Sequence, residues 1–225
     1  MNTTDHLIKS YDDELARLTA EIARMGEMAI AQLGAAMDAI EQRDERAGMK
    51  VFDNDDTLDA MEHTINHDVV RLLALRAPMA RDLREVFAAL RIASDIERIG
   101  DYAANIAKRA VPLSVTDPVA PARGLRHLSD LAVDAVRNVL AAYRDNDAER
   151  ARQVWIDDDE LDQAYISLFR ELLTYMMEDP RSITACTHFL FIAKHIERIG
   201  DHATNIAENV WFVVTGEHLK EGSEK

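Results

Sequence analysis

The residues best suited to chemistry are acidic pairs spaced four apart, and they occur in two copies of the pentapeptide ERIGD. One copy contains Glu97 and Asp101, and the other contains Glu197 and Asp201. On a helix, residues four apart lie one turn from each other on the same face. Carboxylates gathered on one face can hold a hard cation such as Mg²⁺, Mn²⁺, Ca²⁺ or iron, which prefers oxygen ligands. The motif therefore predicts candidate cation sites.

A second kind of acidic pair precedes each ERIGD copy. Asp55 and Asp59 lie in VFDNDDTLD (51–59), and this segment aligns with VWIDDDELD (154–162), which contains Asp158 and Asp162. Adjacent antiparallel helices could bring each pair next to an ERIGD pair. Four carboxylates at close range resist joint ionisation, and a bound cation would remove that repulsion.

Single features of the motif have simpler explanations as well. Acidic residues are mostly exposed, so an isolated pair usually marks a solvated face; the retention of both pair types in two repeats favours a site. Arg98 and Arg198 follow the glutamates, and we expect them to point away from the acids and cover a helix–helix seam. Gly100 and Gly200 weaken a helix by up to about 1 kcal/mol, so their repetition indicates that space is needed there.

Long helices are the elements that must position these acids. Apolar residues recur at steps of three and four, as in Leu15, Leu18, Ile22 and Met25, which is typical of helices in a bundle. The helices are predicted to be separated at Arg43–Asp44, at Pro78, in the segment VPLSVTDPVAP (111–121), at 145–147 and at Pro180. Six helices result, the third running from about Met79 to Ala110.

The order helix, helix, proline, helix occurs twice, and sequence identity supports a duplication. Residues 90–107 and 190–207 are identical at 13 of 18 positions. We therefore predict an all-α fold of two tandem three-helix bundles related by internal duplication. The expected units are residues 1–112 and 119–216, with a polar tail at 217–225.

Composition excludes several classes of function. The chain has 41 Asp and Glu against 26 Lys and Arg, a formal charge of −15, so nucleic acid is not an expected partner. A single cysteine, Cys186, excludes an internal disulfide and a cysteine-based metal site. No apolar stretch suggests a signal peptide or membrane insertion, so a soluble, cytoplasmic protein is expected. Neither a phosphate-binding glycine loop nor G-x-S-x-G is present, and no enzyme is predicted.

The motifs together resemble the PhoU family. The likeness rests on the segments DIERIGDYAANIA and IERIGDHATNIA and on APMARDLR (77–84), and it extends from about residue 5 to 215. It implies two tandem three-helix bundles with metal ions bound on their surfaces. The ligands implied are Asp55, Asp59, Glu97 and Asp101 for one site, and Asp158, Asp162, Glu197 and Asp201 for the other. Possible auxiliary ligands are Glu62, Asn105, His202 and Asn205. The ion could be iron, manganese, magnesium or zinc.

The resemblance also implies a function and partners. It predicts a cytoplasmic negative regulator of phosphate uptake and of the phosphate-starvation response, acting as an adaptor and forming a homodimer. The implied partners are the ATPase subunit of the phosphate ABC transporter and the phosphate-sensing histidine kinase. Two alternatives stay open: a carboxylate-bridged metalloenzyme or metal-storage bundle, and a helical scaffold whose acids are only solvated.

Overall fold

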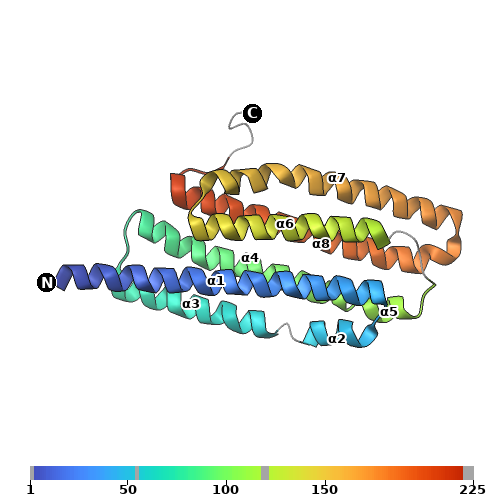
Figure 1. Ribbon diagram of the computed structural model, residues 1–225, viewed down its shortest axis with the longest axis horizontal. Helices are drawn as coiled ribbons and strands as arrows, with labels where there is room; N and C mark the ends of the chain where they lie inside the picture. Colours follow the sequence, from blue (N-terminus) through green and yellow to red (C-terminus); the bar gives the residue numbers. More distant parts are fainter. Residues whose placement is uncertain (1–2, 54–55, 118–121, 220–225) are drawn as a thin grey trace.

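Helices account for nearly all of the chain in the computed structural model, which describes residues 3–53, 56–117 and 122–219, and their side chains except at 3–10 and 122–123. No strand occurs in these ranges. The elements, labelled in Figure 1, are α1 (Thr3–Gln42), α2 (Glu45–Asp53), α3 (Asp56–Arg76), α4 (Arg81–Ala107), α5 (Ala110–Ser114), α6 (Ala122–Asp145), α7 (Ala148–Glu178), the 3₁₀ helix η1 (Pro180–Ser182) and α8 (Ile183–Thr215). No helix in the described part of the chain has the length and apolar character needed to cross a membrane.

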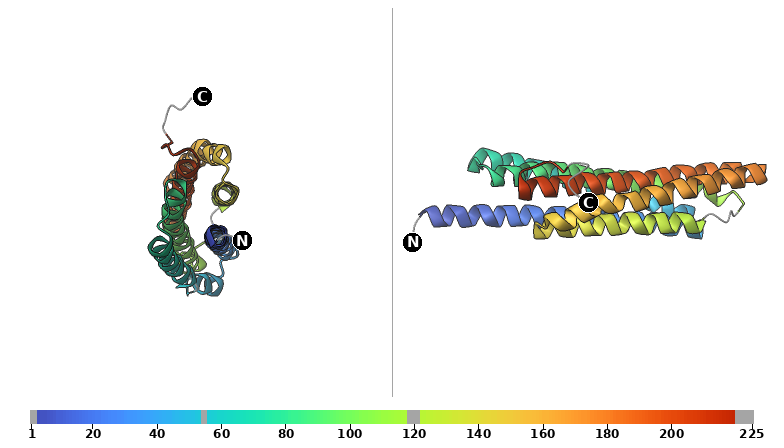
Figure 2. Two further views of the ribbon diagram at one scale, coloured as in Figure 1. Left: turned by 90° about the vertical axis from the view of Figure 1, so that its left-hand side faces the viewer. Right: turned by 90° about the horizontal axis from the view of Figure 1, so that it is seen from above.

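The architecture is the predicted all-α pair of bundles. Helices α1, α3 and α4 form the first bundle, and α6, α7 and α8 form the second. Between them, α4 packs on α8 and α1 packs on α6, while α3 and α7 lie at the outer sides. Viewed along the helices in Figure 2, α4 and α8 lie next to each other. The carboxylates of both ERIGD copies therefore lie on the two helices that join the bundles.

Local sequence explains where the helices end. Arg43 and Asn146 adopt positive φ angles of 55° and 52°, and after each turn an aspartate caps the next helix. The Asp44 carboxylate accepts a hydrogen bond from Ala47 N, and the Asp147 carboxylate accepts one from Arg150 N, both at 3.0 Å. These turns confirm the breaks predicted at 43–44 and 145–147.

The structure differs from the predicted elements after the third helix. The second predicted helix corresponds to α2 and α3, and residues 54–55 between them lie outside the described residues. The third ends at Ala107, and the short helix α5 takes up part of the predicted linker. Pro112 fits in α5 because a proline in the first helical turn removes no intrahelical hydrogen bond.

One continuous apolar core runs through both bundles. The isoleucines of the two motifs, Ile96, Ile99, Ile196 and Ile199, are fully buried in it at 0% exposure. This confirms that the isoleucines face the core, so that the acids one turn apart lie on a different face of each helix.

Polar contacts between α4 and α8 follow the duplication. His202 Nδ1 lies 2.8 Å from Asp95 Oδ1, and farther along α4 the ring of Tyr102 lies 5.5 Å from that of His195. As the residue number rises along α4, the number of the contacting residue on α8 falls, so α4 and α8 are antiparallel. The offset of 100 residues converts the first pair into the second, Asp95 becoming His195 and His202 becoming Tyr102. The seam thus has approximate two-fold symmetry, with different chemistry in its two halves.

The Asp95–His202 contact is expected to stabilise the joined bundles. Its side chains are only 15% and 19% exposed, so Asp95→Ala should lower the free energy of unfolding by about 1–2 kcal/mol, because a buried partner is left unpaired. Asp95→Asn keeps an acceptor for His202 and should lose less. Urea denaturation measures both. A loss from Asp95→Ala no larger than that from Asp134→Ala, whose side chain is 69% exposed in α6, would contradict the expectation.

Candidate metal centres

The first acidic cluster brings together carboxylates from α3 and α4. One oxygen from each of Asp59, Glu97 and Asp101 lies within 4.8 Å of the other two. The three oxygens lie close together because α3 packs antiparallel on α4, which places Asp59 beside Glu97 and Asp101, the two acids one helical turn apart in the ERIGD motif. Asp55, the fourth predicted ligand, lies outside the described residues.

Burial and mutual repulsion destabilise the ionised carboxylates of this cluster when no cation is bound. The Glu97 side chain is 15% exposed. Its pKa is raised by burial first, and further by the neighbouring charges of Asp101, Asp59 and Glu62, against the opposing effect of Arg98. Oxygen ligands held at short range with a raised pKa fit a hard cation, which would remove the repulsion.

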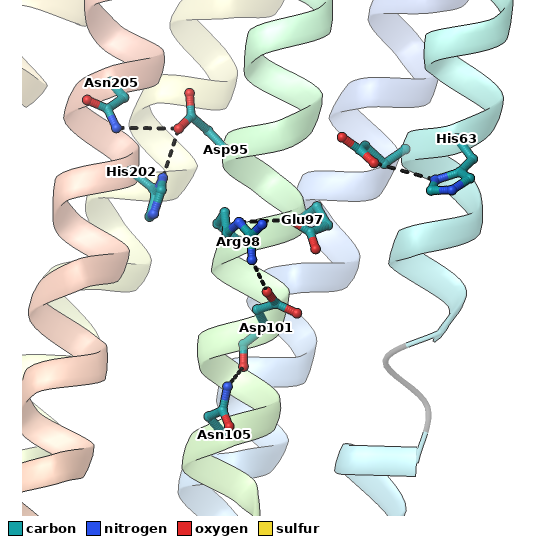
Figure 3. Close-up of polar contacts among 9 residues, drawn as sticks. His63, Asp95, Glu97, Arg98, Asp101, Asn105, His202 and Asn205 are labelled. Atoms are coloured by element: carbon teal, nitrogen blue, oxygen red, sulfur yellow. Dashed lines mark hydrogen bonds and ion pairs between the residues drawn. The ribbon is translucent and has the colours of Figure 1, made fainter.

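Arg98 corrects one sequence-based expectation. Its guanidinium lies on the acids and does not point away from them, with Nη1 2.7 Å from Asp101 Oδ2 and Nε 3.4 Å from Glu97 Oε2 (Figure 3). Residues three apart on a helix are neighbours, and the long side chain folds back along α4 to reach Asp101. The arginine supplies part of the positive charge that the cluster lacks. Because it is 56% exposed, the ion pair is weak enough for a cation to compete.

The second cluster, on α7 and α8, has its own source of strain. Glu197 Oε2 is buried, and its partner is the Lys194 ammonium, which lies 2.5 Å away as an ion pair. Burial, followed by the charges of Asp162, Asp201 and Glu197, raises the pKa of Asp158 to about 6. The pKa of Asp162 is also raised, chiefly by burial and by Glu197. Among described residues, only the first cluster has three carboxylate oxygens within 4.8 Å of one another.

Gly200 allows α7 to approach α8 at this cluster. A Cβ at this position would lie 3.1 Å from the Leu161 side chain and 3.3 Å from Asp158 Oδ1. Both distances are tighter than ordinary packing, so an alanine would require the side chains of Leu161 and Asp158 to shift. The glycine of the second motif therefore provides the space that its repetition predicted.

The predicted auxiliary residues have other partners in this structure. Asn105 Nδ2 donates to Asp101 O at 2.8 Å, within α4, and Glu62 pairs with His63 at 3.5 Å. His202 and Asn205 both face Asp95 across the seam, Asn205 Nδ2 lying 3.4 Å from the same oxygen (Figure 3). Their roles as ligands stay predictions.

Sequence reasoning missed Asp95 and Lys194. Both occupy positions where the otherwise matching repeats diverge, Asp95 against His195 and Ser94 against Lys194. That divergence was the available signal: the isoleucines and the acids of the two ERIGD copies occupy identical positions, whereas Asp95 at the seam and Lys194 beside the second cluster occupy positions that differ.

Asp158 gives a pH-dependent prediction. Its pKa is near 3.8 when exposed and about 6 in the folded chain, so the folded state binds the proton more tightly. Ionisation of Asp158 therefore lowers the free energy of unfolding. This loss grows as the pH rises from about 4 to 6 and reaches its full size above pH 6. Asp158→Asn should stabilise the metal-free protein at pH 7.5 by about 1 kcal/mol, after allowance for solvent screening, and the gain should shrink towards pH 4. Urea denaturation in a chelator tests this, and a destabilised variant at pH 7.5 would contradict it.

Comparisons with known proteins find the same duplication in the sequence. The PhoU domain model matches twice, at residues 22–110 and 125–210. A phosphate-specific transport system accessory protein PhoU homolog from Xylella fastidiosa (strain 9a5c) is 57% identical, with 100% of this chain and 96% of the relative aligned. A homolog of the same name from Caulobacter vibrioides (strain NA1000 / CB15N) is 50% identical over 96% of this chain and 94% of its own length.

Solved structures show the same fold. The crystal structure of PhoU from Pseudomonas aeruginosa superposes with a TM-score of 0.87 at 35% identity, covering 92% of this chain and 100% of its own. The phosphate transport system regulatory protein PhoU from Streptococcus pneumoniae gives the same TM-score at 28% identity, over 94% of this chain and 100% of its own. The curated relatives are named as accessory proteins, a non-enzymatic role, which confirms the expectation that no enzyme is encoded. With a domain model matched in both halves and relatives aligned over nearly its whole length, the chain belongs to the PhoU family.

Proposed function

We propose that the chain is a cytoplasmic negative regulator of phosphate uptake and of the phosphate-starvation response. In this role it acts as an adaptor between the ATPase subunit of a phosphate ABC transporter and a phosphate-sensing histidine kinase. The observation that carries the proposal is the nearly full-length match to proteins named as accessory or regulatory components of phosphate transport systems. The long helical faces and the charge of −15 suit binding to basic surfaces of protein partners.

The acidic clusters are proposed to hold cations in that role. Asp59, Glu97 and Asp101 would bind one ion, and Asp158, Asp162, Glu197 and Asp201 would bind a second. All of these are hard oxygen ligands, which favours magnesium, manganese or iron over zinc. A bound ion would supply the positive charge that now comes partly from Arg98 and Lys194, and would fix α3 on α4 and α7 on α8.

A homodimer is proposed to form through the outer face of α7. Ile166, Phe169, Leu173 and Met177 recur at steps of three and four on this helix and are 38–77% exposed. An apolar stripe of this kind on an outer helix is typical of a protein–protein interface.

Co-isolation tests the adaptor role. Affinity-tagged full-length chain, expressed from its own locus, should co-purify with the transporter ATPase subunit and the histidine kinase when phosphate is abundant, as quantified by mass spectrometry. Deleting the gene should raise phosphate uptake and the expression of phosphate-starvation genes. Absence of both partners at every phosphate concentration, together with unchanged uptake in the deletion strain, would refute the proposal.

A further inference from the structure

A cavity with aromatic walls lies at one end of the α4–α8 seam, away from both acidic clusters. Its volume is about 330 Å³. Phe87 of α4, which is 51% exposed, and Phe212 of α8 form apolar walls. His218 closes a third side by stacking on Phe212, with ring centroids 5.1 Å apart and planes at 11°. Gly216 makes this possible because its φ of 77° turns the chain at the end of α8.

The charge of the cavity is opposite to that of the chain as a whole. Among the described residues, Arg84, Arg91 and Asn209 line it, and no acidic residue does. Arg84 lies 6.0 Å from the Phe212 ring and donates to the Val213 carbonyl oxygen in two long bonds of 3.4 Å. Arg91 has no hydrogen bond or ion pair within the described ranges. Both guanidinium groups line the cavity without an acidic partner in the described part of the chain, so in a chain with a formal charge of −15 they form a locally positive site that can attract an anion.

The opposite end of the seam shows that the fold does not require such a cavity. The repeat offset of 100 relates Arg91 and Asn209 to Phe191 and Arg109. At that end, the Arg109 guanidinium lies 4.5 Å from the Phe191 ring, so the cation and the aromatic ring satisfy each other. At the other end, Arg91 takes the place of Phe191, and the smaller Asn209 takes the place of Arg109. This exchange leaves space in the cavity and a guanidinium group without an aromatic partner in the ranges that the structure describes.

We propose that this cavity binds a nucleoside monophosphate, with the base against Phe87 and Phe212 and the phosphate on Arg84 and Arg91. The exposed ring of Phe87 offers a stacking face to a planar base, and Phe212, which His218 already stacks on, forms an apolar side wall. Guanidinium groups bind phosphate oxygens in pairs with directed hydrogen bonds, and Asn209 can bond to either half of the ligand. A volume of about 330 Å³ lies at the lower end of the range for small-molecule sites, which suits a single nucleotide. This ligand is additional to the proposed cations and does not depend on them.

Calorimetric titration of the full-length protein with adenosine 5′-monophosphate is the test. One saturable site per chain is expected, with adenosine and inorganic phosphate each binding at least about tenfold more weakly, because each meets only half of the cavity. Arg91→Gln should weaken nucleotide binding at least about tenfold, since a charge-assisted bond is lost, and Arg91→Lys should fall between. Arg170→Gln is the matched control: it removes the same charge from an exposed position on α7 and should leave binding within twofold.

Three results would overturn the proposal. The first is an absence of nucleotide binding by the wild-type protein. The second is equal affinity of the wild type and of a folded Arg91→Gln variant, with folding verified by thermal melting. The third is inorganic phosphate binding as tightly as the nucleotide, which would reduce the cavity to a simple anion site.

Discussion

Replacement of Glu97 by glutamine is expected to lower the affinity of the α3–α4 cluster for Mn²⁺ by more than about 100-fold. Loss of an outer-shell partner alone typically costs 10–100-fold, and Glu97 is the least exposed carboxylate of the cluster, between Asp59 and Asp101. The variant also leaves Arg98 free to pair with Asp101 alone. Electron paramagnetic resonance of titrated Mn²⁺ should count two sites per chain in the wild type and one in Glu97→Gln.

Glu208→Gln is the control for this prediction. Glu208 is an exposed residue of α8 outside both clusters, so its replacement removes one negative charge and should leave both sites intact. Equal Mn²⁺ stoichiometry and affinity in the wild type and in Glu97→Gln would mean that the acids of the first cluster are only a solvated surface.

Alanine at Gly48 is expected to destabilise the protein by about 2–3 kcal/mol, the cost of overpacking a rigid contact. An added Cβ would lie 2.6 Å from Ala107 O and 2.7 Å from the Ala110 Cβ. Neither atom belongs to a flexible side chain, so α2 would have to move away from the end of α4. Urea denaturation monitored by circular dichroism measures the change.

Gly34 provides the opposite case in the same protein. It lies within α1, and a Cβ added there meets no atom of the described residues within 4 Å. Gly34→Ala should stabilise the protein by about 0.5–1 kcal/mol, because alanine loses less conformational freedom in a helix. If Gly48→Ala left the free energy of unfolding unchanged or raised it, as Gly34→Ala should, the close packing of α2 on the end of α4 would be contradicted.

The fold was predictable because its signals are repeated. The periodic apolar residues and the matching segments 90–107 and 190–207 predicted the helices, the duplication and the buried isoleucines, all of which the structure confirms. The presence of α5 was not predictable. It packs on α2, where Gly48 lies close to Ala110, and local sequence preferences do not encode such tertiary contacts.

The candidate site was predictable in its residues and only partly in its geometry. Spacing alone placed Glu97 beside Asp101, and alignment of the repeats added Asp59. Spacing could not determine where long side chains turn, so the expectation for Arg98 was wrong. Nor could it show that His202 faces Asp95, since that contact depends on how α8 packs against α4 and not on either helix by itself.

Anomalous diffraction from Mn²⁺-soaked crystals of the full-length protein tests the central claim, that the acidic clusters of both repeats are cation sites. We predict one anomalous peak within about 2.0–2.6 Å of oxygens from Glu97 and Asp101, with Arg98 displaced, and a second beside Glu197 and Asp201. Fully occupied manganese elsewhere, with no peak at either cluster and Arg98 still paired with Asp101, would contradict it.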